Sequence, residues 1–208
     1  MSTDCRKWWM KYTNSKDLDA IGSVLLRHTP QLISISTQRQ ASVALILRDP
    51  GKGPEVLFIQ RATSELDPWS GQIAFPGGGK EVFDRSCLDA AIRETLEETG
   101  VALMPQMTVG RLDDHQGRNN NRSLNLVISC FVFRIEERPE LIPNYEVAEV
   151  FWVPLTYLLD PVNAFDYQTA FRSQTYPAID LGPGESGQSR ILWGLTYRFV
   201  QNLISVLS

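Results

Sequence analysis

Three glutamates are crowded into the short segment RETLEETG, residues 93–100. Glu94, Glu97 and Glu98 stand at i, i+3 and i+4, so on an α-helix with ~100° per residue they share one arc of about 100°. Like charges at these spacings repel each other, and Arg93 can compensate only part of their charge. Carboxylate oxygens are the ligands that Mg²⁺ and Mn²⁺ prefer. The spacing therefore predicts a helix on which the glutamates form either a solvated acidic face, the commoner case for a run of charges, or a divalent-metal site.

A glycine-rich segment, FPGGGKEVFD at residues 75–84, precedes this helix and favours the metal interpretation. Glycine has no side chain, so backbone amides and carbonyls in such a turn can approach a ligand closely. Gly77 and Gly78 are therefore candidates for contact with a phosphate-bearing substrate. Gly100 is placed to end the helix as a C-terminal cap.

Patterns of apolar residues predict the elements that position these groups. The helix is expected over residues 86–99, with one side formed by Leu88, Ala91, Ile92, Leu96 and Thr99. Other periodic segments predict a short helix from residue 17 to about Arg27, strands at 41–49, 55–61, 124–135 and 147–153, and a closing helix at 191–207. Segments 62–79 and 161–190 are expected to be loops, the second over the surface. Strand pairs interleaved with helices predict an α/β sandwich.

The bulk composition limits the class of protein. A net charge of -4 and a pI near 5.3 give no reason to expect nonspecific nucleic-acid binding. No run approaches the ~20 apolar residues of a membrane span, so a soluble protein is expected. An odd number of cysteines that match no zinc spacing predicts inert thiols in a reducing cytoplasm. These cysteines are Cys5, Cys87 and Cys130.

Residues 78–101 resemble the Nudix box, G-x5-E-x7-R-E-U-x-E-E-x-G-U, in which U is a bulky apolar residue. The second half matches at Arg93, Glu94, Glu97, Glu98, Gly100 and Val101. The first half departs from the pattern, because Asp84 takes the place of the first glutamate and lies one residue farther from Arg93. Thr95 stands where an aliphatic residue is usual. For Asp84, a metal-binding role and a role at the helix N-terminus are both open.

The resemblance extends to one branch of this family, the coenzyme A pyrophosphatases. Residues 61–78, RATSELDPWSGQIAFPGG, resemble the segment before the box in that branch, R-[SA]-x3-R-x3-G-x3-F-P-G-G. Leu66 replaces the second arginine of the pattern, and one residue is added before Gly71. Residues 192–203 resemble the closing helix of the same branch.

The resemblance implies a Nudix fold, an α/β/α sandwich with a mixed β-sheet, over residues 41–208, preceded by an N-terminal helical extension at 1–40. It implies metal-dependent hydrolysis of a nucleoside diphosphate derivative, coenzyme A or one of its derivatives. Hydrolysis of ADP-ribose, NADH or a nucleotide sugar is an alternative, and a noncatalytic nucleotide sensor is another. Family members are often dimers, so a homodimer is one expectation.

The resemblance also implies roles for single residues. Glu94, Glu97 and Glu98, with the backbone carbonyl of Gly78, are expected to bind Mg²⁺ or Mn²⁺, and Glu97 and Glu98 are counted as catalytic. Glu146 is the candidate general base.

Three further residues carry weaker expectations. Glu149 is the alternative to Glu146 as general base, since both lie at the start of a predicted strand. Glu146 could also be an exposed loop carboxylate without a catalytic role. Arg61 is a candidate phosphate contact. His115, in a polar segment, is expected to be a solvated loop histidine.

Overall fold

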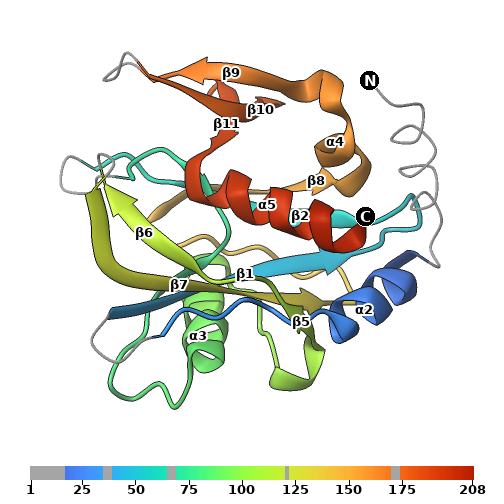
Figure 1. Cartoon of the computed structure of the whole chain (residues 1–208). Helices are drawn as coiled ribbons and strands as arrows, with labels where there is room; N and C mark the ends of the chain where they lie inside the picture. The colour runs from blue at the N-terminus through green and yellow to red at the C-terminus, as the bar shows by residue number, and fades with distance from the viewer. Residues whose placement is uncertain (1–16, 35–38, 65–68, 120–121, 170–173) are drawn as a thin grey trace.

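The computed structural model describes residues 17–34, 39–64, 69–119, 122–169 and 174–208 (Figure 1). Leu66 lies outside these residues, as do the first sixteen residues of the expected N-terminal extension. Along the described chain the elements are α2 (Asp17–Arg27), β1 (Arg39–Arg48), β2 (Glu55–Arg61), β3 (Ile73–Ala74), β4 (Gly77–Gly79), α3 (Cys87–Thr99), β5 (Thr108–Arg111), β6 (His115–Asn119), β7 (Arg122–Arg134), β8 (Val147–Pro154), α4 (Leu155–Leu159), β9 (Ala164–Gln168), β10 (Thr175–Pro183), β11 (Ser189–Trp193) and α5 (Gly194–Leu207).

Strand β1 organises the larger of the two sheets. It runs parallel to β7 and antiparallel to β2 and β4, so the sheet is mixed, as expected. Within the described residues this sheet has eight strands, β8 and β3 pairing with β2, and β5 and β6 with β7. The centre of β1 is apolar on both of its faces, which is typical of a strand covered on both sides.

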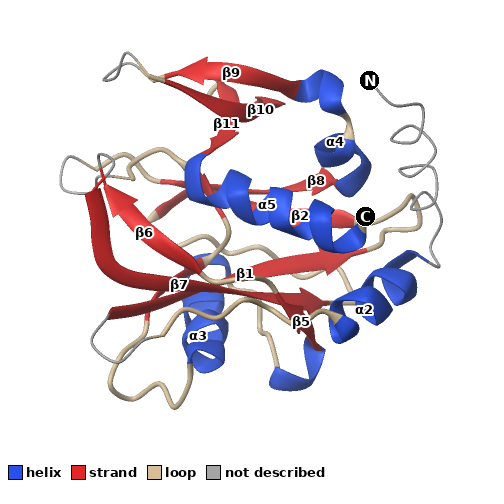
Figure 2. Cartoon of the chain, in the orientation of Figure 1, coloured by secondary structure: helices blue, strands red, loops and turns tan. Residues whose placement is uncertain are grey.

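Helices cover both faces of this sheet (Figure 2). Leu45 and Leu47 of β1 face the core shared with α2, α4 and α5. Ala44 and Ile46 alternate with them and face the core shared with α3, because successive side chains of a strand point to opposite faces. The predicted α/β/α sandwich with a mixed sheet is confirmed.

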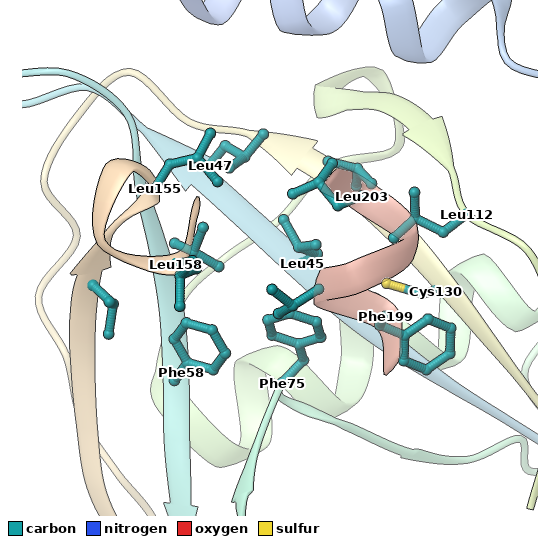
Figure 3. Close-up of a cluster of buried hydrophobic side chains, with 14 of the residues drawn as sticks. Leu45, Leu47, Phe58, Phe75, Leu112, Cys130, Leu155, Leu158, Phe199 and Leu203 are labelled. Carbon is teal, nitrogen blue, oxygen red and sulfur yellow. The ribbon is translucent and has the colours of Figure 1, made fainter. Parts of the chain in front are cut away.

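The core on the α5 side is built around stacked aromatic rings. The ring centroid of Phe58 lies 5.0 Å from that of Phe75 and 6.0 Å from that of Phe151. Figure 3 shows side chains of β1, β2, α4 and α5 in one cluster, among them Leu158 and Leu203. This packing fixes the start of the glycine-rich strand, since Phe75 immediately precedes Pro76 and β4.

Helix α2 belongs to the same packed unit. Leu18, Ile21 and Leu25 are at most 5% exposed and lie in the core with α5. The predicted helix up to Arg27 is confirmed. None of the helices in the described ranges is both long and apolar enough to cross a membrane.

Helix α3 begins and ends close to its predicted bounds. The side chain of Ser86 caps the N-terminus by accepting from the amide of Asp89, and Gly100, at φ 75°, closes the C-terminus. The prediction that Leu96 lies on the inner side is wrong, since Leu96 is 51% exposed. Thr95 is buried instead, and its hydroxyl donates to the carbonyl of Ala91 at 2.7 Å, so its polar atom is satisfied.

Residues 161–190 are not the surface loop that their proline and glycine content predicts. Strands β9, β10 and β11 form a three-stranded antiparallel sheet that leads into α5, at the top of Figure 1. The closing helix accordingly begins at Gly194, because the first residues of the predicted helix belong to β11. Pro177 is accommodated within β10, so its presence did not exclude a strand.

Candidate active site

Glu98 is the buried centre of the site. It is 2% exposed, its Oε2 accepts the amide hydrogen of Gly77 at 2.8 Å, and Nη1 of Arg61 lies 3.8 Å from its Oε1. Burial raises the pKa of Glu98 to about 7, although the Gly77 amide and Arg61 oppose the shift. A buried carboxylate held this way gains from a further positive charge nearby.

The glycines of β4 let this strand lie close to both β1 and α3. A Cβ on Gly77, whose φ is +151°, would lie 2.2 Å from the carbonyl oxygen of Ser42 on β1. A Cβ on Gly78 would lie 2.5 Å from Oε1 of Glu94. A side chain at either position therefore needs the neighbouring chain to move.

Arg93 joins the glycine segment to the glutamates. It donates to both carboxylate oxygens of Asp84, at 3.1 and 2.9 Å, and to the carbonyl of Gly79 at 3.0 Å. Its Nη1 also donates to Glu94 at 2.9 Å and to Glu97 at 3.2 Å. Arg93 thus orients two of the three glutamates.

The structure shows what Asp84 does in this chain. Its side chain is 4% exposed, and its hydrogen bonds with Arg93 lower its pKa. It also accepts the amide hydrogen of Glu81 at 2.8 Å. The N-cap of α3 is Ser86. Asp84 is therefore the partner of Arg93, and it is not the cap of the helix.

The other two glutamates differ in exposure. Glu94 is half-buried, and burial raises its pKa, with further contributions from the charges of Glu97 and Glu146. The Glu97 side chain is 53% exposed. Among the residues that the structure describes, no three His, Cys, Asp or Glu side chains converge closely enough to hold a metal ion in their present positions. Glu94 and Glu97 instead face Arg93.

The two candidate bases have different surroundings. Glu146 is exposed, and its backbone carbonyl accepts the amide hydrogen of Ala62 at 2.7 Å. Its charge contributes to the raised pKa of both Glu94 and Glu98, after burial. Glu149 is engaged elsewhere, since Nη1 of Arg190 lies 3.4 Å from its Oε1. Of the two residues, the geometry favours Glu146.

A cavity of about 810 Å³ lies beside these groups. Gly77 and Arg61, which both contact Glu98, are among its lining residues. Among the residues that the structure describes, its charged lining is four cations and one carboxylate, although the chain carries a net charge of -4. An anionic ligand is therefore favoured. These five residues are Arg39, Arg61, Lys80, Glu81 and Arg198.

Part of the cavity wall was missed by the sequence interpretation. Tyr176 and Trp193 come from the three-stranded sheet and line the cavity together with Trp69. Arg198 comes from the first turns of α5. No local motif marks these residues, because the fold gathers them from segments far apart in the sequence.

The expectation that His115 is a solvated loop histidine is wrong. His115 begins β6 and is half-buried, with its ring centroid 4.7 Å from that of Phe199. Its Nδ1 lies 3.1 Å from Nη2 of Arg198. Burial, and then the charge of Arg198, lower the pKa of His115 to about 4. The imidazole is therefore neutral at physiological pH.

The comparisons with known proteins agree with this architecture. The family model described as NUDIX domain matches residues 38–172, more than half of the chain. Together with the relatives that are named Nudix hydrolases, this match indicates a pyrophosphatase. The chain belongs to the Nudix family.

The sequence identity to individual relatives is low. The chain is 27% identical over 202 residues to the uncharacterized Nudix hydrolase NudL of Pectobacterium atrosepticum, covering 91% of this chain and 94% of the relative. It is 26% identical over 159 residues to the mitochondrial coenzyme A diphosphatase NUDT8 of mouse, covering 74% and 71%. An uncharacterized protein of Schizosaccharomyces pombe is 34% identical over 158 residues, covering 66% of this chain, which spans about half (48%) of that relative.

One solved structure covers the whole chain. A MutT/nudix family protein from Enterococcus faecalis aligns with 100% of this chain and 75% of its own, at a TM-score of 0.53 and 17% identity. At this identity the likeness supports the fold and carries no information about the substrate.

Proposed function

We propose that this chain hydrolyses the diphosphate linkage of a nucleoside diphosphate derivative, with coenzyme A or one of its derivatives as substrate and Mg²⁺ or Mn²⁺ as cofactor. The observation that carries the proposal is the buried Glu98 carboxylate, held by Gly77 and Arg61 directly beneath the lining of a cationic cavity. The similarity to a coenzyme A diphosphatase over 74% of this chain supports the choice of substrate.

The donor set fits a divalent cation. Glu94, Glu97 and Glu98 offer carboxylate oxygens, and the backbone carbonyl of Gly78 is proposed as a further ligand. The raised pKa of Glu94 and Glu98, caused first by burial, means that a nearby cation stabilises both ionised carboxylates. The exposed Glu97 side chain is free to leave Arg93 and turn toward the same point. A bound Mg²⁺ or Mn²⁺ supplies charge neutralisation and an activated water.

The remaining roles follow from position. Arg61 lies at the cavity surface and is proposed to donate to the diphosphate. The missing side chains of Gly77 and Gly78 leave room for a phosphate close to β4. Glu146 is proposed to accept the proton of the attacking water, since its carboxylate is exposed and acts on Glu94 and Glu98. Arg93 positions the glutamates and does not touch the substrate in this proposal.

The test is a substrate panel incubated with Mg²⁺ or Mn²⁺, with products identified by mass. The panel holds coenzyme A, NADH, ADP-ribose, a nucleotide sugar and a nucleoside triphosphate. We expect coenzyme A to be split into 4'-phosphopantetheine and adenosine 3',5'-bisphosphate. Glu97→Gln should lower kcat by roughly a hundredfold or more, because it removes a metal ligand. Glu140→Gln, an exposed glutamate outside the site, is the matched control.

Each other outcome has a defined meaning. Preference for a different diphosphate would overturn the coenzyme A assignment and leave the hydrolase assignment in place. Binding of a nucleotide without turnover, with either metal, would replace the hydrolase by a nucleotide sensor.

A further inference from the structure

An ion pair outside the cavity joins the small sheet to the large one. Arg190 belongs to β11 and Glu149 to β8, and Nη1 of Arg190 lies 3.4 Å from Oε1 of Glu149. The guanidinium carbon of Arg190 also lies 4.0 Å from the centroid of the Phe151 ring. The side chains of Glu149 and Arg190 are only 10% and 17% exposed. Since water and salt screen such a pair little, it favours one position of the small sheet relative to the large one.

The turn between β10 and β11 is built against the same carboxylate. The amide of Glu185 donates to Oε2 of Glu149 at 3.4 Å, and Nη2 of Arg190 donates to the carbonyl of Pro183. A Cβ on Gly184 would lie 2.8 Å from Oε2 of Glu149. The glycine therefore lets the turn approach Glu149 closely. Both oxygens of this carboxylate thus contact the small sheet or its turn.

The opposite end of these two strands forms part of the cavity wall. Trp193, the last residue of β11, lies opposite Ala178, and Tyr176 lies two residues away from Ala178 on β10. The ring centroids of Trp193 and Tyr176 are 5.3 Å apart, and both residues line the cavity. Leu192 and Ile179 lie opposite each other between the wall and the turn, and both are buried in the core. The position of the wall therefore depends on this core contact and on the ion pair beyond it.

The ion pair itself does not line the cavity. Glu149 lies opposite Gln60 on β2, and Gln60 lies opposite Ile73 on β3. Ile73 does line the cavity. Neighbouring strands are ~4.8 Å apart, so two strand spacings place Glu149 about 10 Å from Ile73. Glu149 can therefore act on a ligand in the cavity through the position of the small sheet.

We propose that the ion pair between Glu149 and Arg190 positions the small sheet so that Trp193 and Tyr176 complete the substrate-binding cavity. Glu149 and Arg190 are positioning residues, and Glu149 is not the general base in this assignment. This inference rests on the proposed function, because it takes the cavity as the substrate site. The two residues act as one unit, so the loss of either partner releases the same constraint.

A second arginine, stacked on the next residue of β8, supplies a matched control. The guanidinium carbon of Arg48 lies 4.0 Å from the ring centroid of Trp152, and its Nη2 lies 3.0 Å from Oε2 of Glu55. Trp152 packs against the core on the α3 side, and neither Arg48 nor Glu55 lines the cavity. Loss of this control pair should therefore affect stability without moving the small sheet.

The position of Trp193 can be measured by NMR without ligand and without metal. We expect the indole N–H signal of Trp193, assigned with Trp193→Phe, to shift in Arg190→Ala. Glu149→Ala should shift it in the same direction, because both variants release the same sheet. Arg190→Lys keeps a positive charge near Glu149 but loses the planar group over Phe151, and should give a smaller shift. Arg48→Ala should leave the signal in place.

Coenzyme A tests the consequence for binding. Calorimetric titration with the metal removed by EDTA should show an affinity about fivefold or more weaker in Arg190→Ala and in Glu149→Ala than in the wild type. With Mg²⁺, KM should rise by a similar factor with little change in kcat, since the pair does not touch α3 or β4. The double variant should be no weaker than either single variant, because the two residues act as a unit. Arg48→Ala should keep the wild-type affinity and KM.

Three results would overturn the proposal. The first is an unchanged Trp193 signal in Arg190→Ala. The second is a pair of independent effects that multiply in the double variant. The third is an equal loss of affinity in Arg48→Ala, which would assign the effect to stability alone. Failure of the proposed function is distinguishable, because it appears as absent hydrolysis across the whole substrate panel, whereas the Trp193 signal is measured without substrate.

Discussion

Arg93 and Glu98 occupy two separate hydrogen-bonded groups in this site. Arg93 holds Asp84, Glu94 and Glu97 in one hydrogen-bonded group. Glu98 lies outside this group and is buried against Gly77. The departure of Asp84 from the family pattern is explained by this geometry, because an aspartate one residue farther from Arg93 still accepts hydrogen bonds from its Nε and Nη2.

A cation-binding role of Glu98 predicts a specific effect on thermal stability. Saturating Mn²⁺ should raise the Tm of the wild-type chain by roughly 5 to 10 °C, because a ligand that binds only the folded state stabilises it. Glu98→Gln should lose most of this increase, while Glu140→Gln should keep it. An undiminished increase in Glu98→Gln would remove Glu98 from the ligand set.

His115 predicts the pH dependence of stability. Its pKa in the folded chain is about 4, below its ordinary value of about 6.5. The unfolded chain therefore binds more protons in this window, and the contribution of His115 is complete above about pH 6.5 and lost as the pH falls through about 4. Denaturant unfolding at about pH 7.5 and about pH 5 should show a smaller acid-induced loss in His115→Gln than in the wild type.

Charged groups near His115 act on its pKa in opposite directions. Arg198 lowers its pKa, while Asp113 and Asp114 raise it. An NMR titration of the wild-type imidazole checks the cause directly. A midpoint near the ordinary value of about 6.5 would contradict the buried, arginine-paired state.

At the scale of elements, local sequence patterns predicted the helix that carries the glutamates, but they did not predict the small sheet that forms part of the cavity wall. Helix α3 was predicted because its apolar periodicity and its capping glycine lie within one short segment, and strand β2 was predicted because its apolar residues are contiguous. The sheet of β9–β11 was not, because each of its strands buries few residues and its prolines and glycines are typical of loops. Leu96 was wrongly predicted on the inner side of α3, because that side is partly polar and buries Thr95 and Glu98.

The glycines of β4 allow the contact between this strand and α3 to be tested one position at a time. Gly78→Ala places a methyl group 2.5 Å from the Glu94 carboxylate. That group is the flexible end of a side chain, so Glu94 should move aside while the fold survives. We expect activity to fall at least about tenfold with a change in stability below about 1 kcal/mol.

The neighbouring glycines supply the controls. A Cβ on Gly79 meets nothing within 4 Å, so Gly79→Ala should retain activity. Gly77→Ala meets the backbone of Ser42 and requires φ +151°, so it should lose about 2 kcal/mol or more of stability. Equal activity of Gly78→Ala and Gly79→Ala would mean that the position of Glu94 is unimportant.

At the scale of the whole molecule, the packing of α2 bears on where the catalytic unit begins. The sequence interpretation sets residues 1–40 apart as an extension, because the family resemblance starts at residue 41. In the structure Ile21 is fully buried in the core that also contains Phe199 and Leu203 of α5. Asp113 links the same two helices, since it contacts His28 just beyond α2 and accepts a hydrogen bond from Asn202 of α5.

We propose that α2 and the catalytic unit unfold together, and Ile21→Ala tests this. Removing the buried side chain should cost about 2–5 kcal/mol, whereas Leu26→Ala, at a position that is 73% exposed, should change stability by less than about 0.5 kcal/mol. Tryptophan fluorescence and far-UV circular dichroism should report one coincident transition in urea for both variants. An early separate transition in Ile21→Ala, with activity retained beyond it, would instead mark α2 as an independent extension. The single transition is expected because α2 and α5 share one core, so the loss of either helix exposes apolar surface of the other.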